Sequence, residues 1–545
     1  MSFTVLRLVS DGWRPLLDRF ARALAPDGFE PWDYPFAPTD VAQLQRLSAH
    51  DPADRLDDPT WRDLLLDRYS ERLSAQTSIF GRQALYRRLR NGAGTEEAAL
   101  RRARIETLLA DRARLEALHR ALRPLRHTDV EAAGLLFDPV HQMPAQPAWL
   151  PAWYLIQLLL AVSIAAALLM SPAAWIGAAV AMYLLVALQM RYRERAAELQ
   201  RPVATLQMML RVCAALDGSA HPLAHDFSGR GALAGRINRG LACTPGVEQV
   251  PGMKEYLDWF MLDNVRHYFR SARLVFGQRA FLRECYELCA GLEADVALAR
   301  HLLATPAWCW AQRNGARSLA LDGAVHPLVD GASPLSLGLE GKGAFLSGQN
   351  GVGKSTFLRT LGLNLAAARA FGFCYARQAS LPALLVVASM QNEDSLLGGQ
   401  SLYVAELARA RALLAAAADG GRPVVCLIDE IFRGTNHEES VSAAAAVLDE
   451  LAGRALVVVS SHNLVLGPLL AHRLAPWRVA HGPDGALALE PGVLGRTNGI
   501  ALLADHGFDA AVQDKAGRVA GWLASQRGVG AGADLLDDVP RRVLK

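Results

Sequence analysis

The chain has 545 residues, 51% of them hydrophobic, which is enough material for several domains with large cores. Its 57 Lys and Arg nearly balance its 54 Asp and Glu, and the resulting net charge of +3 does not mark a nucleic-acid-binding protein. The seven cysteines include no C-x-x-C pair. Cys285 and Cys289 lie one helical turn apart, which favours a buried helix face in a reducing compartment over a structural zinc site.

The first residues of the chain are not typical of a secretory signal. Arg7 and Asp11 interrupt the apolar run that a signal peptide requires. We therefore expect the start of the chain to stay in the cytoplasm.

A long uncharged stretch occupies the middle of the chain. No Asp, Glu, Lys or Arg occurs between Asp138 and Arg191. A helix needs about 20 apolar residues to cross a bilayer, and residues 151–170 and 173–190 come close to that length. The Ser-Pro pair at 171–172 predicts a turn between them, because proline lacks the amide hydrogen of a continuing helix. The alternative interpretation is a buried helical hairpin in a soluble core.

The residues beside this stretch predict its orientation. Basic residues stand on both sides of it: Arg123, Arg126 and His127 before, and Arg191, Arg193 and Arg195 after. Such flanks favour the cytoplasmic side, and Trp149, Trp153 and Tyr154 suit a membrane interface. We therefore predict that residues 150–190 contact the lipid membrane as a transmembrane hairpin. The protein would be a two-pass protein of the inner (cytoplasmic) membrane with both termini cytoplasmic, although the hairpin could also lie in the membrane without spanning it.

Residues 348–355, GQNGVGKS, fit the phosphate-loop pattern G-x-x-x-x-G-K-[ST] in full. The preceding GAFLS is typical of a short buried strand, and Phe357, Leu358, Leu361 and Leu365 follow at helical spacing. This strand–loop–helix context predicts a site for ATP and Mg²⁺. Its predicted nucleotide-binding residues are Gly348, Gly351, Gly353, Lys354, Ser355 and Thr356, with Lys354 on the β and γ phosphates and Ser355 on the metal.

Two further apolar runs predict strands that end in polar side chains. PVVCLIDE ends in Asp429, which would hold Mg²⁺ through water, and Glu430, which would polarise the attacking water. ALVVVSSH ends in His462, which would sense the γ phosphate or be an ordinary histidine at a strand end. The predicted catalytic residues are Lys354, Glu430 and His462, and the predicted metal ligands are Ser355 and Asp429.

Two ATPase families share these parts. LLGGQSLYVAELARARALL, residues 396–414, resembles the L-S-G-G-Q segment of ABC transporters, which usually continue D-E-P-T after their acidic strand. Here the acids continue as DEIFRGTNHEES, which resembles the D-E-I-G-R-G-T run of the MutS family. HPLV at 326–329, GGQSLYVAEL at 399–408 and the closing segment 491–519 are similar to other MutS motifs in the same order. Residues 326–520 thus resemble a MutS-type ATPase domain.

The resemblance extends upstream to helical segments. TSIFGRQALYRRLRNG, residues 77–92, and residues 282–308 are similar to the helices that open and close the MutS core, although Arg/Leu/Ala-rich helices of unrelated proteins look alike. The implied fold is multidomain, α plus α/β: a helical core with the transmembrane hairpin, then a P-loop domain of the ABC superfamily with a doubly wound, mostly parallel sheet. The implied parts are an N-terminal segment (1–55), core (56–140), hairpin (150–190), core (191–310), ATPase domain (311–525) and tail (526–545).

The resemblance implies an ATP hydrolase that works as a homodimer through its ATPase domains. Ser401 would approach the γ phosphate bound to the opposite subunit, or else would cap the following helix. Residues 433–435, Arg-Gly-Thr, would lie on the loop between the two sites, and Asn350 matches the loop asparagine of the family.

One departure from the family bears on DNA. Mismatch-recognising members carry a Phe-x-Glu wedge in an N-terminal domain, whereas Phe29 and Glu30 are adjacent here and about fifty-five residues precede the core. We therefore keep two interpretations: a membrane-anchored MutS-like ATPase that binds DNA of unknown structure in repair or recombination, and a membrane-bound mechanochemical or signalling ATPase without DNA binding. An ABC transporter subunit is less favoured, because two spans per chain give four per dimer.

Overall fold

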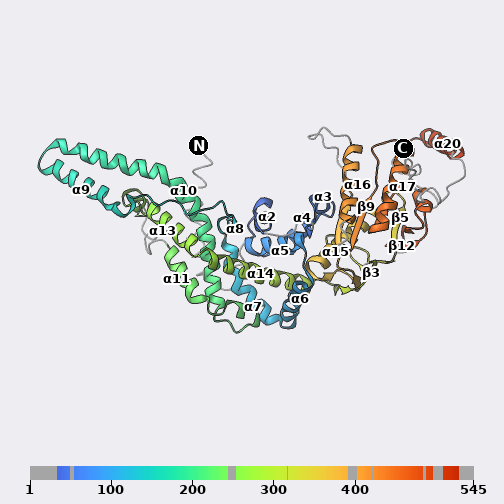
Figure 1. The fold of residues 1–545 in the computed structure, drawn as a ribbon, viewed down its shortest axis with the longest axis horizontal. Helices are drawn as coiled ribbons and strands as arrows, with labels where there is room; N and C mark the ends of the chain where they lie inside the picture. Colours follow the sequence, from blue (N-terminus) through green and yellow to red (C-terminus); the bar gives the residue numbers. More distant parts are fainter. Residues whose placement is uncertain are drawn as a thin grey trace, which may run out of the picture. The chain divides into compact units, whose positions relative to one another are not determined.

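The computed structural model describes residues 33–48, 54–242, 253–315, 317–390, 402–418, 422–482, 486–494 and 507–526. The chain divides into two compact units. The first contains the residues up to Ser48, Ser74–Ala84 and Asp111–Ala297, and the second contains Ala49–Leu73, Leu85–Ala110 and the residues from Leu298 on. Helices α5 (Ile79–Asn91) and α14 (Arg279–Ala304) contribute to both units (Figure 1). The predicted combination of helical and α/β parts is confirmed.

The described part of the first unit is helical. Its other elements are α2 (Pro38–Leu47), α7 (Arg112–Leu122), η2 (Arg123–His127), α8 (Ala133–Phe137), η3 (Leu150–Ala152), α9 (Tyr154–Leu169), η4 (Pro172–Ala174), α10 (Trp175–Leu216), η5 (Pro222–Phe227), α11 (Gly231–Leu241), α12 (Met253–Phe260) and α13 (Asp263–Gly277). Cys285 and Cys289 are fully buried on α14, which confirms the prediction of a buried helix face.

The start of α5 is held by a buried carboxylate from α14. Glu293 accepts hydrogen bonds from the backbone amides of Ser78 at 2.9 Å and Gly81 at 2.8 Å, and from the Ser78 hydroxyl. The first amides of a helix have no partner within the helix, so the carboxylate supplies one from outside. A side chain at position 81 would meet Glu293 Oε2 at 2.9 Å, which explains the glycine there.

The uncharged stretch forms a helical hairpin. Helices α9 and α10 pack along each other, and the turn between them lies at residues 170–174, where the Ser171 hydroxyl accepts a hydrogen bond from the Ala173 amide (Figure 1). The second helix does not end with the apolar run near residue 190, because α10 continues to Leu216 through Pro202. Beyond the apolar run its inward side chains, among them Leu206 and Leu210, are buried in the unit, and this packing sustains the helix.

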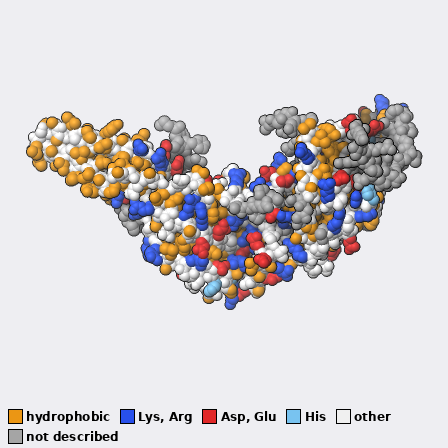
Figure 2. Space-filling view, viewed as in Figure 1, with side chains coloured by type: hydrophobic (Ala, Val, Ile, Leu, Met, Phe, Trp, Pro, Cys, Tyr) orange, Lys and Arg blue, Asp and Glu red, His pale blue; other side chains and the backbone are white. Residues whose placement is uncertain are grey.

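The hairpin exposes its apolar side chains. Leu150–Leu169 and Pro172–Leu216 are both long and apolar enough to cross a membrane. In the most apolar 18 residues of each, only 6% of the first segment and 22% of the second is buried. Leu169 and Met170 at the turn are 84% and 85% exposed. Figure 2 shows hydrophobic side chains over this projection and basic side chains where it joins the rest of the unit. A helix of a soluble core would bury such a surface.

The second unit carries a six-stranded sheet of order β12-β11-β5-β10-β9-β8. Its strands are β5 (Gly343–Gly348), β8 (Leu385–Ser389), β9 (Val424–Asp429), β10 (Leu456–Ser460), β11 (Leu474–His481) and β12 (Leu487–Pro491). β12 is antiparallel to β11, and the other pairings are parallel. The strands predicted from GAFLS, PVVCLIDE and ALVVVSSH are confirmed as β5, β9 and β10. Their side chains are almost all buried, as expected of parallel strands.

Helices and two smaller sheets complete the second unit. The helices are α3 (Asp58–Asp63), α4 (Leu66–Leu73), α6 (Thr95–Ala110), α15 (Lys354–Phe371), α16 (Leu402–Ala418), α17 (His437–Arg454), α18 (Leu466–Leu469) and α20 (Ala510–Gln526). One small sheet has the order β2-β7-β3-β4, with β2 (Gln312–Arg313), β3 (Ser318–Ala324), β4 (Leu335–Glu340) and β7 (Gln378–Leu381), and the other pairs β1 (Cys309–Trp310) with β6 (Phe373–Cys374).

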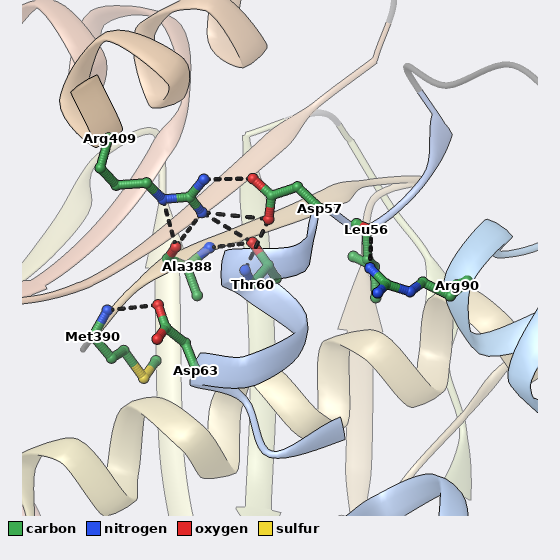
Figure 3. Close-up of polar contacts among 8 residues, drawn as sticks. All are labelled: Leu56, Asp57, Thr60, Asp63, Arg90, Ala388, Met390 and Arg409. Carbon is green, nitrogen blue, oxygen red and sulfur yellow. Dashed lines mark hydrogen bonds and ion pairs between the residues drawn. The ribbon is translucent and has the colours of Figure 1, made fainter. Parts of the chain in front are cut away.

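Helix α3 covers the exposed edge of strand β8. The Ala388 amide donates to Thr60 Oγ1 at 2.9 Å, and the Met390 amide donates to Asp63 Oδ2 at 2.8 Å (Figure 3). An edge strand presents unpaired amides and carbonyls that invite pairing with another chain. Side chains from residues 60 and 63 therefore take the place of a neighbouring strand, although they lie more than three hundred positions away in the sequence.

Arg409 of α16 completes this cover. Its Nε donates to the Ala388 carbonyl at 3.1 Å, its Nη2 donates to Thr60 Oγ1 at 3.1 Å, and its guanidinium pairs with Asp57 (Figure 3). Burial would raise the pKa of Asp57, but the hydrogen bond and charge of Arg409, with hydrogen bonds from Thr60, outweigh it and lower the pKa. The carboxylate is therefore charged at neutral pH, and the pair joins α3, β8 and α16.

The segment around α3 also contacts the helix that follows the phosphate loop. Arg359 of α15 donates to the Asp63 carbonyl at 3.1 Å. Leu64 is fully buried against Gly362, where an added side chain would meet Leu64 Cδ2 at 2.3 Å. On the other side, Arg90 of α5 donates to the Leu56 carbonyl at 2.6 Å. Residues 56–64 are thus fixed to four elements of the second unit.

We predict that the Thr60 hydroxyl contributes more to stability than its methyl group. Thr60→Val keeps the shape but leaves the buried Ala388 amide without its acceptor, which should cost about 1–3 kcal/mol. Thr60→Ser keeps the acceptor and loses one methyl group, which should cost about 1 kcal/mol. Denaturant unfolding of the two variants measures both values, and a valine variant as stable as the serine variant would contradict this account of the edge.

Candidate functional site

The predicted phosphate loop connects β5 to α15. Gly351 and Gly353 have φ of +75° and +102°, a region that favours glycine, so two of the motif glycines are required by the backbone. Gly348 at the end of β5 is required by space, because a side chain there would lie 3.0 Å from the Val479 carbonyl oxygen. The loop leads directly into α15, whose free amides and positive end form a site for anions.

Lys354 is folded into this loop. Its buried ammonium group donates to the carbonyl oxygens of Gly348 and Gln349, both at 3.0 Å. Burial lowers the pKa of Lys354, while the nearby charges of Asp429 and Glu430 act against that shift. The cation is therefore held at the loop by two carbonyl groups and faces two carboxylates.

Asp429 lies where three segments meet. It is the last residue of β9, and it accepts hydrogen bonds from the Ser355 hydroxyl at the start of α15 and from the Ser460 hydroxyl at the end of β10. In the sheet β10 lies between β5 and β9, and Ser460 is in register with Asp429. The parallel alignment thus brings the phosphate loop and the acidic strand end together. The sequence analysis missed Ser460, although its position at the end of a buried strand was a usable signal.

Glu430 and His462 face each other across the ends of β9 and β10. His462 Nε2 lies 2.6 Å from Glu430 Oε1, and Arg433 Nη1 lies 3.5 Å from Glu430 Oε2. The hydrogen bond from His462 lowers the pKa of Glu430, burial opposes this, and the charges of His462, Arg433 and Lys354 assist it. Glu430 has φ of +60°, a strained backbone for a non-glycine residue and one that is concentrated at functional sites.

The loop after Glu430 is fixed from α16. The carboxylate of Glu406, 2% exposed, accepts hydrogen bonds from the backbone amides of Arg433 at 3.0 Å and Gly434 at 3.1 Å. A side chain at position 434 would approach the Tyr403 amide nitrogen to 2.6 Å, so the glycine lets the loop pack on α16. From the sequence, only a structural role on the helix after Ser401 could be expected of Glu406. The apolar neighbours of this glutamate on a predicted helix were the available signal for a buried carboxylate.

The remaining predicted residues divide into two groups. Asn350 and Thr356 are exposed, Asn350 in the phosphate loop and Thr356 in the first turn of α15. Ser401 lies outside the described residues, so its predicted role stays a prediction.

Among the described residues, no three His, Cys, Asp or Glu side chains form a metal cluster. The oxygen atoms of Ser355 and Asp429 nevertheless suit Mg²⁺, which typically takes one or two protein oxygens and keeps several waters.

Comparisons with known proteins identify this region. Residues 344–475 match the family model of MutS domain V. The DNA mismatch repair protein MutS of Synechococcus sp. (strain CC9902) is 31% identical over 256 residues, 44% of this chain and 28% of that protein. MutS of Thermus aquaticus is 29% identical over 277 residues, 49% of this chain and 33% of that protein. MutS of Paracoccus denitrificans (strain Pd 1222) is 28% identical over 298 residues, 50% of this chain and 33% of that protein.

The chain therefore spans about a third or less of the length of these relatives. The match to domain V runs from β5 to β11 and includes Lys354, Ser355, Asp429, Glu430 and His462. Residues 344–475 of the chain thus form a domain of the MutS domain V family.

Proposed function

We propose that the protein binds and hydrolyses ATP with Mg²⁺ at the ends of β5, β9 and β10. The observation that carries this proposal is the convergence of Lys354, Ser355, Asp429, Glu430 and His462 on one edge of a mostly parallel sheet. Ligands of open α/β sheets bind at this edge. The doubly wound arrangement of the ABC superfamily, with this sheet as its centre, is part of the proposal.

The phosphate loop and its neighbours bind the phosphates and the metal ion through different residues. Amides of the phosphate loop and the start of α15 bind phosphate oxygens, and Lys354 exchanges its two carbonyl partners for the β and γ phosphates. Ser355 and Asp429 hold Mg²⁺, which neutralises phosphate charge when it is bound. Ser460 keeps Asp429 in place through its hydrogen bond.

Glu430 acts as the general base. Its carboxylate is ionised at neutral pH, since the hydrogen bond from His462 lowers a pKa that is ordinarily already acidic, and the ionised group accepts a proton from water. His462 and Arg433 orient the carboxylate from two sides, and Glu406 fixes the loop that carries Arg433. The attacking water thus gives a proton to Glu430 as its oxygen bonds to the γ phosphorus, while the bond from that phosphorus to the bridging oxygen breaks and ADP leaves.

We further propose that two chains pair through their ATPase domains and that the protein acts on DNA. The relatives are named DNA mismatch repair proteins, and the resemblance implies a composite site with Ser401 of one subunit near the nucleotide of the other. In the alternative, a membrane-bound mechanochemical or signalling ATPase, no DNA is bound. The net charge of only +3 favours this alternative, because DNA binding relies on basic side chains that neutralise phosphates.

We also propose that the hairpin inserts into the inner membrane, with both termini and the ATPase domain in the cytoplasm. The exposed apolar surface and the basic residues at the base of the hairpin support this placement (Figure 2).

We predict that Lys354→Ala abolishes ATP binding and hydrolysis, because it removes the only phosphate-loop cation that the motif supplies. The control is Lys342→Ala, which changes an exposed lysine at the start of β5 whose Nζ donates to the Ala471 carbonyl at 3.0 Å. ATPase rates of the detergent-purified protein, with and without duplex, mismatched and branched DNA at one salt concentration, test both variants.

The same assay distinguishes the two functions. If one DNA raises the ATPase rate and Lys354→Ala abolishes this stimulation, the DNA-acting function is supported. If no DNA changes the basal rate, the alternative is supported.

We predict that Glu430→Gln slows hydrolysis by about a hundredfold or more while nucleotide remains bound, because it removes the base and leaves the phosphate loop intact. Glu438→Gln, on the exposed first turn of α17, is the matched control and should keep the rate of the native protein. Single-turnover hydrolysis and binding of a fluorescent nucleotide separate the two effects. An unchanged rate in Glu430→Gln would remove this residue as the base.

We predict that charges on the exposed faces of the hairpin prevent membrane insertion. Val162→Asp with Val180→Asp changes side chains that are 57% and 48% exposed, so the fold tolerates them in water. Each aspartate near the bilayer centre should cost about 2.5–3.5 kcal/mol. Leu100→Asp, at an exposed leucine of α6, is the control. Resistance of membrane fractions to carbonate extraction measures insertion, and full resistance of the double variant would refute it.

A further inference from the structure

Helix α12 is tied to the base of the hairpin by two glutamines. Gln157 of α9 donates to the Phe260 carbonyl oxygen at 2.9 Å. Gln189 of α10 donates to the Asp258 carbonyl oxygen and exchanges hydrogen bonds of 3.0 and 2.9 Å with Asn264. Apart from serines, these glutamines are the strongly polar side chains of residues 150–190. Both are therefore used to hold the last turn of α12 and the segment that follows it.

These hydrogen bonds set the level of α12 along the hairpin. Gln157 stands three positions after Tyr154, where α9 begins, and Gln189 stands two positions before Arg191, the first charged residue after the apolar run. A helix rises 1.5 Å per residue, so both glutamines lie within about 5 Å of the ends of the apolar segments of α9 and α10. The last turn of α12 therefore lies at the boundary between the apolar and the charged parts of the unit.

Helix α12 has an exposed apolar face at this level. Met253, Tyr256 and Trp259 recur at every third position, and they are 38%, 48% and 38% exposed. Side chains three apart lie close to one face of a helix. Tyr and Trp are enriched where a membrane meets water, because their rings are apolar and their OH or NH groups still find polar partners.

The side chains around α12 also fit a membrane interface. The Arg266 guanidinium lies 4.1 Å from the ring centroid of Trp153, and Trp149 and Tyr192 are in ring contact with centroids 6.0 Å apart. Leu150, Leu185 and Leu262 belong to one buried apolar cluster at the base of the hairpin, and Phe260 packs against it. Arg191, Arg193 and Arg195 are exposed directly after the apolar run, where lipid phosphates would lie.

We propose that α12 is an interfacial helix whose Met253, Tyr256 and Trp259 lie in the headgroup layer and the upper acyl layer of a lipid bilayer. This inference rests on the proposed insertion of the hairpin and adds a second, in-plane contact with the same membrane. This placement explains why the apolar hairpin contains two glutamines. A side-chain amide without a hydrogen-bond partner is costly in hydrocarbon, and here the backbone carbonyls of α12 accept hydrogen bonds from both NH₂ groups at the interface. Helix α12 also limits how deeply the hairpin can enter.

Fluorescent labels at three positions test this placement in full-length protein reconstituted in phosphatidylcholine–phosphatidylglycerol vesicles. Each variant carries an environment-sensitive dye on one introduced cysteine: Tyr256→Cys on α12, Leu168→Cys in the hairpin, or Arg236→Cys on the exposed face of α11. The background is Cys243→Ser with Cys309→Ser, since the other five cysteines are buried. Lipids brominated close to the carbonyl group or close to the chain end quench dyes at shallow or deep positions.

We predict quenching of the dye at 256 by the shallow bromolipid, of the dye at 168 by a bromolipid of either kind, and of the dye at 236 by neither. Quenching at 168 but not at 256 would overturn the interfacial helix and leave the inserted hairpin intact. No quenching at 168 would refute the insertion and the inference together. Met253→Cys places a second label on the same face of α12, and it decides the outcome if Tyr256→Cys disturbs the fold.

Discussion

The proposed nucleotide site depends on one carboxylate that joins three segments of the chain. Asp429 accepts hydrogen bonds from Ser355 and Ser460, which stand 74 and 31 positions away in the sequence. The three residues meet because β5, β10 and β9 are parallel neighbours, so the chain leaves all three strands at the same edge of the sheet. The phosphate loop, Glu430 and His462 follow directly from these strand ends, and the sheet thereby sets the distances within the site.

The same sheet shows why the second unit is discontinuous in sequence. Strand β8 is an edge, and its outward amides are satisfied by Thr60 and Asp63. The α15 helix in turn uses Arg369 to hold the last turn of α5, donating to the carbonyls of Arg90 at 3.3 Å and Asn91 at 2.8 Å. Burial lowers the pKa of Arg369 to about 10, and it stays charged at neutral pH. Residues 54–73 and 85–110 are therefore part of the unit that carries the proposed nucleotide site.

Sequence reasoning located the strands and the glycine-rich loop that consecutive residues mark. The phosphate loop and the strands ending in Asp429 and His462 were predictable, because each combines a buried strand with chemistry at its end. The contacts of Arg409 with Asp57 and Thr60 were not predictable, since they join residues about 350 positions apart and no local pattern marks them. The length of α10 was also missed, because the apolar run ends near 190 while tertiary packing sustains the helix beyond it.

Helix α10 runs through both the hairpin and the rest of the helical unit and joins them as one continuous helix. Its 42 residues continue without interruption from Trp175 at the turn of the hairpin to Leu216, which is buried among the helices of the unit. A straight helix of this length is about 63 Å long. Since both ends belong to one continuous helix, a displacement of the buried end must move or tilt the apolar end, unless the helix bends at Pro202.

Nucleotide binding can shift such a helix only through contacts that differ between its two positions, so the coupling must be sought where α10 packs on its neighbours. The contacts of Thr205 with Val130 and of Gln189 with Asn264 are polar examples at two levels of the helix.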